Sequence, residues 1–376
     1  MGAPILRDTD AAALMRSYLQ RIATGPDMSK DLSLEDARSG MQIILEGRIH
    51  PVQTAVFLIA LRMKRETDDE NRGILDAIRQ TTRFATARVD ELVEIADPYD
   101  GFARHLPASP FLPAVLAACG VPTVSHGVKS VGPKFGLTHH QVLSAAGIDI
   151  DLSPGEAAER ISDPETAWAY VDQCHYSPAL YGLVELRNLI VKRPCIATLE
   201  VMAGPVRSAG RSHLVHGYVH SGYKRIYIEL ARFAGYHSAC IIKGIEGGIV
   251  PLLNKKINCV GYRDTGDKSA REFELDPTGA GVITGNRAVP LSANDQYDPI
   301  EKATTVPPSV LHAARLGLEA LQGVSGLTRD SLIYTAAACL VQIQRFSDLR
   351  SAAQHVGEVI DNGRALAHFR NLSTTG

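Results

Sequence analysis

Apolar residues in the first ninety positions recur at the spacing of amphipathic helices. Ser33 opens a capping pattern ahead of an apolar stripe over 37–45, and Gly47 ends the run. Two more stripes follow, over 52–63 behind a proline and over 67–78 behind an acidic first turn. This part of the chain is therefore predicted to be a small all-helical domain.

After Asp90 short apolar runs alternate with helical stripes, which predicts a mostly parallel central sheet flanked by helices. The expected elements are strands 92–96, 122–125, 214–219 and 237–242, helices 111–119, 138–146 and 223–234, antiparallel strands 257–262 and 271–275, and helices 309–321, 332–344 and 349–360. A loop rich in Asn, Asp and Pro is expected over 284–308.

These patterns divide the chain into a helical domain, 1–90, and an α/β domain, 91–164 and 194–376, with a helical insertion at about 165–193. No apolar helical stretch approaches the roughly 20 residues that span a bilayer. The N-terminus lacks the regions of a secretory signal, and the six scattered cysteines contain no C-x-x-C pair. We therefore expect a cytoplasmic α/β protein with reduced thiols and no membrane segment.

The net charge of −2 hides an uneven distribution. Residues 27–100 hold 15 acidic and 10 basic residues, whereas residues 187–256 hold 11 basic and three acidic ones. The basic segment would attract a phosphate-bearing partner. Alternatively, its charges are balanced in space by the acidic lobe. The sequence leaves both interpretations open.

Several short motifs recur in the order and spacing of a known family. They are the stretch 47–70, which reads GRIHPVQTAVFLIALRMKRETDDE, then His126-Gly127 with Lys129, Val131, Lys134 and Gly136, Ser177-Pro-Ala179 with Arg187, Gly244-Ile-Glu-Gly247, and Asp276-Pro277 with Gly281. Together they resemble the anthranilate phosphoribosyltransferase family from about residue 11 to residue 372.

That resemblance implies a small helical domain joined to a larger α/β domain, a homodimer formed through the helical lobe, and transfer from phosphoribosyl pyrophosphate. Arg187 falls where the family has its anthranilate-contacting arginine. His126, Gly127, Lys129 and Lys134 fall on the family's K-H-G-N-R-x-x-S-S-K-S-G loop and are candidate substrate-binding residues.

The loop that holds pyrophosphate in this family is altered here. Its G-T-G-G-D-G motif corresponds to 96–101, Ala-Asp-Pro-Tyr-Asp-Gly, in which only Asp100 and Gly101 are retained. Pro98 lacks an amide donor, whereas glycines let backbone amides approach a phosphate closely. The following N-x-S-T motif retains only Ser109. Ordinary anthranilate transfer is therefore not expected.

The metal motif is also altered. Mg²⁺ prefers carboxylate oxygens, but the family's adjacent D-E pair falls on Gly248-Ile-Val250, which has no acid. Glu246 is the one carboxylate retained, so any Mg²⁺ binding would depend on it.

The altered loop that begins at 96–101 instead resembles a divergent second branch of the family, which has Y-N-G-A-R-K in place of the glycines. Members of that branch are reported to bind nucleic acid. In that comparison Arg104 is a candidate phosphate contact.

Alternatives stand beside each candidate. His126 either contacts a ligand or holds its loop, and Lys129 and Lys134 either contact phosphate or are solvated. Arg187 lies on an otherwise apolar helix face, which favours a guanidinium that faces a cleft. The leading hypothesis is a glycosyl or phosphoribosyl transferase-like protein that takes a phosphorylated small molecule. A nucleic-acid-binding homodimer using residues 187–256, or a dimeric regulatory scaffold without catalysis, are the alternatives.

Overall fold

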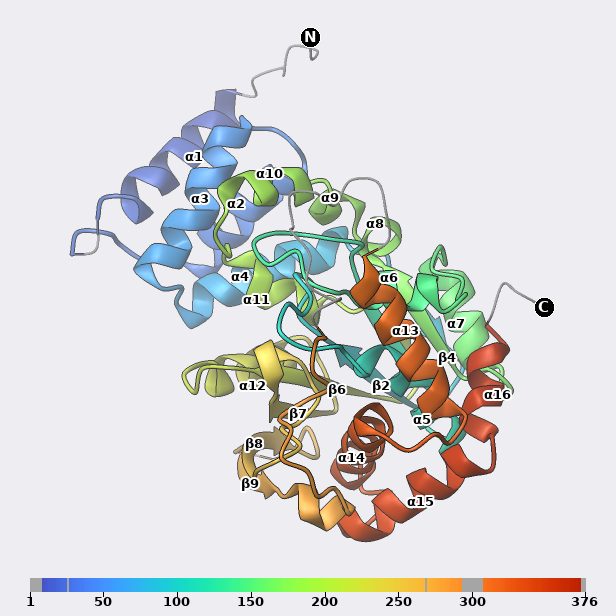
Figure 1. The fold of residues 1–376 in the computed structure, drawn as a ribbon. Helices are drawn as coiled ribbons and strands as arrows, with labels where there is room; N and C mark the ends of the chain where they lie inside the picture. The colour runs from blue at the N-terminus through green and yellow to red at the C-terminus, as the bar shows by residue number, and fades with distance from the viewer. Residues whose placement is uncertain (1–8, 26, 268, 293–306, 373–376) are drawn as a thin grey trace.

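The computed structural model describes residues 9–25, 27–267, 269–292 and 307–372 (Figure 1). Its helices are α1 (Thr9–Ile22), α2 (Leu34–Leu45), α3 (Pro51–Lys64), α4 (Asp68–Thr81), α5 (Leu112–Ala118), α6 (His139–Ala145), α7 (Pro154–Ser162), α8 (Gln173–Tyr176), α9 (Pro178–Tyr181), α10 (Val184–Ile190), α11 (Ile196–Leu199), α12 (Tyr223–Phe233), α13 (Pro308–Leu321), α14 (Leu327–Gln342), α15 (Leu349–Asp361) and α16 (Arg364–Arg370). Its strands are β1 (Ala85–Ala87), β2 (Glu91–Ala96), β3 (Thr123–Gly127), β4 (Trp168–Asp172), β5 (Val206–Ser208), β6 (Arg211–Tyr218), β7 (Ser238–Lys243), β8 (Ile257–Tyr262) and β9 (Arg271–Leu275).

Local signals start the helices of the N-terminal lobe where the sequence predicts them. The Ser33 side chain accepts a hydrogen bond from the amide of Asp36, and Thr67 and Glu70 form a reciprocal capping box ahead of α4. Helices α2 and α4 then pack closely. A Cβ at Gly73 would lie 2.2 Å from the carbonyl oxygen of Leu34, so only glycine permits this approach.

The central sheet has seven strands in the order β4-β3-β2-β6-β7-β8-β9. The first five strands are parallel, and β8 and β9 join antiparallel at one edge. A separate parallel pair, β1 and β5, lies outside this sheet. The mostly parallel α/β architecture with a helical N-terminal domain confirms the predicted fold class.

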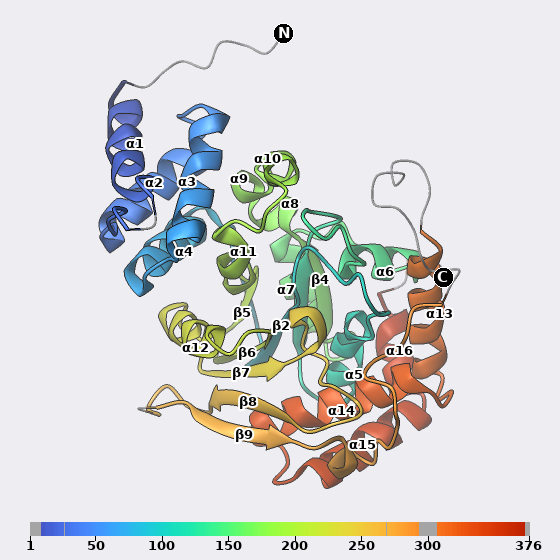
Figure 2. The same ribbon diagram turned by 60° about the vertical axis from the view of Figure 1, so that its left-hand side comes forward.

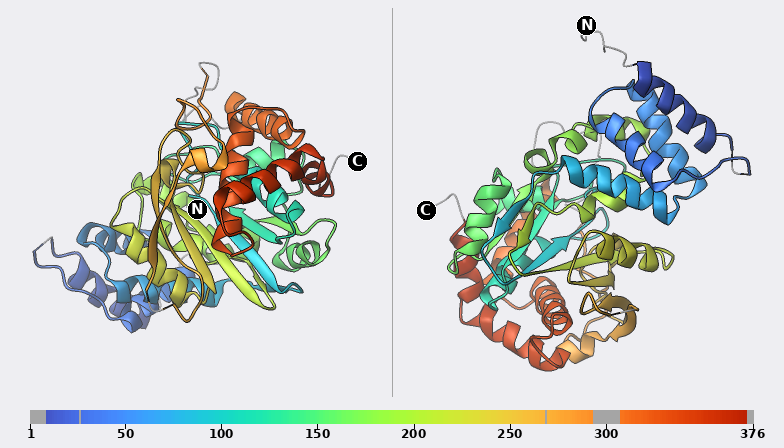
Figure 3. Two further views of the ribbon diagram at one scale, coloured as in Figure 1. Left: turned by 90° about the horizontal axis from the view of Figure 1, so that it is seen from below. Right: turned by 180° about the vertical axis from the view of Figure 1, so that it is seen from behind.

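Alternate side chains of the sheet enter two different cores. Leu214 and Ile241 pack in one apolar cluster with the helical lobe and α12, whereas their neighbours Val215 and Ile242 pack in another with α5 and α13–α16. Figure 2 shows the sheet between these two layers, and Figure 3 shows α14 and α15 on the face away from the N-terminal lobe. Burial on both faces explains the continuous apolar strand sequences.

The segment expected as a helical insertion, 165–193, contains a strand. Buried apolar residues of 168–172 form β4 at the sheet edge, and helices begin only at Gln173. Helices α10 and α11 then contact α3 and α4 of the lobe.

The division into domains stays a prediction. Of the expected loop 284–308, residues 293–306 lie outside the described part of the chain. No helix among the described residues is long and apolar enough to cross a membrane.

Candidate functional site

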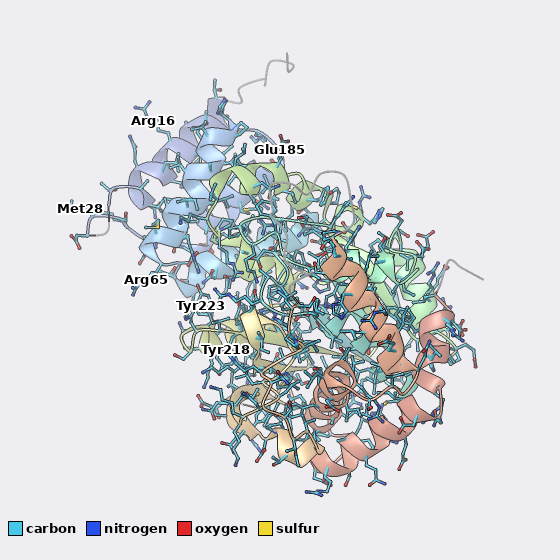
Figure 4. All side chains as sticks on the ribbon, in the orientation of Figure 1. Arg16, Met28, Arg65, Glu185, Tyr218 and Tyr223 are labelled. Carbon is cyan, nitrogen blue, oxygen red and sulfur yellow. The ribbon has the colours of Figure 1, made fainter. Side chains whose placement is uncertain are left out.

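A cavity lies at the carboxyl ends of β2 and β6, where ligands of parallel α/β proteins commonly bind. The helical lobe contributes Arg62 from α3, and the loop after β2 contributes Pro98, Tyr99 and Asp100. The other wall comes from the end of β6 and from α12. Figure 4 labels Tyr218 and Tyr223, which lie where α12 faces the N-terminal lobe.

Arginines line this cavity, and acidic residues neutralise them. Arg187 donates two hydrogen bonds of 2.7 Å each to the carboxylate of Glu200, and both side chains are about 1% exposed. Arg193 donates to Asp100 at 2.5 Å, and its guanidinium is more exposed. The second pair therefore offers a cation that a ligand in the cavity can reach.

Aromatic side chains form the rest of the lining. Tyr223 and Tyr227 lie one turn apart on α12, and the Arg62 guanidinium lies 5.5 Å from the centre of the Tyr223 ring. The His216 ring packs edge-on against Tyr227, and its Nδ1 donates to the carbonyl of Ala96 at 2.5 Å. Burial lowers the pKa of His216 to about 4. His216 is therefore neutral at physiological pH.

A buried chain of hydrogen bonds holds the altered loop 96–101. The Tyr99 hydroxyl bonds to His126 Nδ1 and to the hydroxyl of Tyr176, and His126 Nε2 lies 3.1 Å from Glu94 Oε1. The same oxygen accepts from Tyr236 at 2.5 Å. His126 is thus enclosed and uses both ring nitrogens within the protein, a geometry that favours the loop-holding alternative over contact with a ligand.

A second buried cluster pins the loop after β2 to two other segments. Asp97 accepts hydrogen bonds from Ser109, from His139 at 2.8 Å, and from the amide of Ile249 at 2.9 Å. His139 Nε2 also lies 3.2 Å from Ser109 Oγ, so one ring nitrogen faces both Asp97 and Ser109. In a Ser-His-Asp triad the histidine uses a different ring nitrogen for each partner, so these three side chains are not arranged as a triad. Ser109 therefore supports the loop and does not face the cavity.

Glu246 is bound by donors of the same loop. Its carboxylate accepts from the amides of Ala103 and Arg104 and from His105 Nδ1, at 2.7–3.2 Å. Burial acts to raise the pKa of Glu246, but the His105 hydrogen bond, the backbone amides and the charge of Lys134 outweigh it and bring the pKa to about 2. Both oxygens of Glu246 accept from these donors.

These contacts do not fit a divalent metal. Among the described residues, no group of three or more His, Cys, Asp or Glu side chains is placed to hold one. Asp97 and Glu246 are the carboxylates nearest the family's metal motif. Both instead accept hydrogen bonds from N–H or O–H donors of the protein.

Of the predicted site residues, Asp100 and Arg187 line the cavity. Gly101 has φ +72° beside Gly136, where any Cβ would lie 2.6 Å from backbone atoms. Gly127 ends β3 opposite Asp172. The other predicted residues do not line the cavity: Lys134 pairs with Asp100, Arg104 and Lys129 have exposed side chains, and His126 and Ser109 are buried.

Sequence reasoning did not single out four residues of the cavity lining, namely Arg62, Arg193, Tyr223 and Tyr227, although three of them had a signal. Arg62 belongs to the matched stretch 47–70, and Tyr223 and Tyr227 have the i, i+4 spacing of one helix face. Arg193 had no signal beyond the basic character of its segment, because only the fold brings it to Asp100.

The basic segment 187–256 is largely neutralised in the structure. At least seven of its eleven basic residues pair with carboxylates, namely Arg187, Arg193, Arg207, Arg211, Lys224, Arg225 and Lys256. Arg225 pairs with Asp68 of the acidic lobe. These pairs leave little of the segment free for nucleic-acid phosphates, and nucleic-acid binding stays a prediction.

Comparison with known proteins places this architecture. Residues 16–82 match the glycosyl transferase family, helical bundle domain, and residues 108–366 match the glycosyl transferase family, a/b domain. The chain belongs to this family. Proteins with similar sequences include an uncharacterized protein of Aquifex aeolicus, 31% identical over 242 residues that cover 64% of this chain and 71% of the relative. An anthranilate phosphoribosyltransferase of Syntrophomonas wolfei is 25% identical and covers 94% of this chain and 96% of its own length.

Solved structures with the same fold include two anthranilate phosphoribosyltransferases. Anthranilate phosphoribosyltransferase from Thermus thermophilus superposes with a TM-score of 0.70 at 18% identity, over 96% of this chain and 98% of the other. The enzyme of Saccharomyces cerevisiae, solved in complex with PRPP and Mg, superposes with a TM-score of 0.73 at 14% identity, over 96% and 97%. The resemblance that the motifs predicted is therefore confirmed.

Proposed function

We propose that this protein is a phosphoribosyltransferase-like member of the family that binds a small phosphorylated ligand in the cavity between β2, β6 and α12, with a substrate other than anthranilate. The observation that carries the proposal is the lining of the cavity, which combines a reachable guanidinium, Arg193, with the rings of Tyr223 and Tyr227. Guanidinium groups bind phosphate oxygens in a planar, bidentate way, and tyrosine rings pack against sugars or bases.

The charges of the lining limit what the cavity takes. The charge of Arg187 is already balanced by Glu200, and Asp100 accepts one hydrogen bond from the Arg193 guanidinium. Pro98 and Tyr99 stand where the family has glycines, so the loop offers few amides to a pyrophosphate. These features favour a ligand that carries a single phosphate group over a diphosphate that is bound together with Mg²⁺.

A thermal-shift screen tests the proposal directly. Ribose 5-phosphate, mononucleotides, phosphoribosyl pyrophosphate and aromatic acids are compared at equal ionic strength, because a ligand stabilises only the state that binds it, by about 2.7 kcal/mol at a hundredfold excess over Kd. At least one monophosphate should raise the melting temperature. Arg193→Ala should abolish that rise, and Lys255→Ala, an exposed lysine away from the cavity, should keep it. No rise with any ligand, or a rise that survives Arg193→Ala, would contradict the proposal.

We also propose that the helical lobe forms a homodimer. Helix α3 exposes Val52 and Met63, which are 61% and 76% exposed, and Leu14 of α1 is also exposed. An apolar groove lies between these helices, lined by Ile22, Val56 and Met63 among others. Exposed apolar surface of this kind is typical of an interface.

Analytical ultracentrifugation tests this assembly. The wild type should sediment as a dimer, and the double variant Val52→Asp with Met63→Asp should sediment as a monomer. A monomeric wild type would exclude this assembly.

A further inference from the structure

Beside the cavity, the ammonium group of Lys134 stands between two carboxylates. Its Nζ lies 3.2 Å from Asp100 Oδ1 and 3.8 Å from Glu246 Oε2. The nitrogen is enclosed and makes no well-directed hydrogen bond, so it acts on both acids as a point charge. It also lies 5.8 Å from the centre of the Phe102 ring.

These two acids come from the two altered motifs. Asp100 belongs to the loop that replaces the phosphate-binding glycines, and Glu246 precedes the segment that has lost the paired metal-binding acids. The two segments are tied together reciprocally. Asp97 of the loop accepts from the amide of Ile249, and Glu246 accepts from the amides of Ala103 and Arg104.

The charges around Lys134 are already balanced. Asp100 and Glu246 carry two negative charges, and Lys134 and Arg193 carry two positive ones. A divalent cation would have to displace the Lys134 ammonium, strip Glu246 of its amide donors and sit close to Arg193. Each of these steps is unfavourable. A buried polar group that is left without a partner destabilises the protein by its full desolvation penalty, and like charges repel each other at short range.

We propose that Lys134 takes the place of the divalent cation, so that the loops around the cavity are held in position by an internal ammonium group and this protein needs no metal there. The inference does not depend on which ligand the cavity binds. It makes Lys134 a positioning residue that acts through Asp100 and Glu246.

Manganese provides the test, because free aqueous Mn²⁺ gives an electron paramagnetic resonance signal that is lost on binding. The wild type should leave this signal unchanged through the submillimolar range, with no Mn²⁺-dependent rise in melting temperature. Stoichiometric Mn²⁺ uptake by the wild type at submillimolar concentration would overturn the proposal, and this measurement needs no variant and no cavity ligand.

Substitution of Lys134 sharpens the test. Lys134→Gln leaves the two carboxylates without their ammonium, so it should lower the melting temperature by about 2 °C. It should also tighten Mn²⁺ binding at least about tenfold relative to the wild type, because one repelling charge is gone. Lys134→Arg keeps the charge and should bind no Mn²⁺, and Lys255→Gln, with the same change of charge at an exposed position, should match the wild type.

The variants overturn the proposal in two ways. If Lys134→Gln melts like the wild type, the ammonium does not hold the loops. If it takes up no more Mn²⁺ than Lys255→Gln, the ammonium does not stand in a cation position. A shift with a phosphorylated ligand that is abolished by Arg193→Ala would leave both conclusions unchanged, so this inference and the proposed function can fail separately.

Discussion

The two ends of the central sheet pair their charges in different ways. At the amino end, Glu91 opens β2 and pairs with Arg345 at 2.7 Å and Arg211 at 3.2 Å, whose side chains are 51% and 56% exposed. At the carboxyl end, beside the cavity, Arg187 and Glu200 pair in a site that solvent does not reach. Glu91 itself is only 4% exposed, so water can replace the lost partner of the arginines at the amino end, whereas at the carboxyl end it can do so for neither partner.

This difference separates a stabilising surface from a preorganised site. A pair with one exposed partner contributes less than an enclosed pair, because water competes for the exposed guanidinium. An enclosed pair holds its geometry because breaking it leaves a charge without solvation. The wall of the cavity should therefore keep its shape without a ligand, whereas the amino end should respond mainly to pH and salt.

The largest effect is expected for Arg187→Met. The substitution leaves the Glu200 carboxylate enclosed and unpaired, and should lower the free energy of unfolding by about 3–5 kcal/mol in urea titrations. The double variant Arg187→Met with Glu200→Leu removes both charges and should recover much of the loss. If the double variant is no more stable than the single one, the pair is not the source of the cost.

Glu91→Gln should have a moderate and pH-dependent effect. Burial acts to raise the pKa of Glu91, but hydrogen bonds from His213 and Arg345 outweigh it and lower the pKa from 4.5 to about 2. A carboxyl group with a depressed pKa stabilises the fold above pH 4.5, and this stabilisation is lost as the pH falls toward 2. Urea unfolding should show the variant about 1–2 kcal/mol less stable at neutral pH, with the difference shrinking in acid. A difference that stays constant with pH would count against this linkage.

The smallest effect is expected for Arg211→Ala. Its guanidinium is mostly exposed, and Glu91 keeps both Arg345 and His213 without it. The free energy of unfolding should change by less than about 0.5 kcal/mol, measured in the same urea titrations. A loss as large as that of Glu91→Gln would show that the amino end is as tightly coupled as the cavity.

The fold could be predicted because its signals are local. The Ser33 and Thr67 caps, the apolar stripes of the first helices and the alternation of strands with helices all act over a few residues. The strand β4 inside the expected helical insertion was missed because it is only five residues long and all five are buried, so the sequence shows little periodicity there.

The candidate site was only partly predictable. The otherwise apolar helix face around Arg187 predicts a guanidinium that faces a cleft, and Arg187 does line the cavity, where it binds Glu200. The partner itself, Glu200, could not be named. His126 lies at a strand end, as expected, but its donors and acceptors are Tyr99 and Glu94, each about 30 residues away, and only the packed sheet shows that they enclose the ring.

The chain from Tyr176 through Tyr99 and His126 to Glu94 also constrains how this loop can evolve. Replacing Tyr99 with the glycine of a phosphate-binding loop would leave Tyr176 and His126 without the hydroxyl that they share inside the core. An orphaned buried polar group costs about 1–3 kcal/mol. A return to a glycine loop by single substitutions therefore passes through less stable intermediates, and the core has to be rebuilt together with the loop.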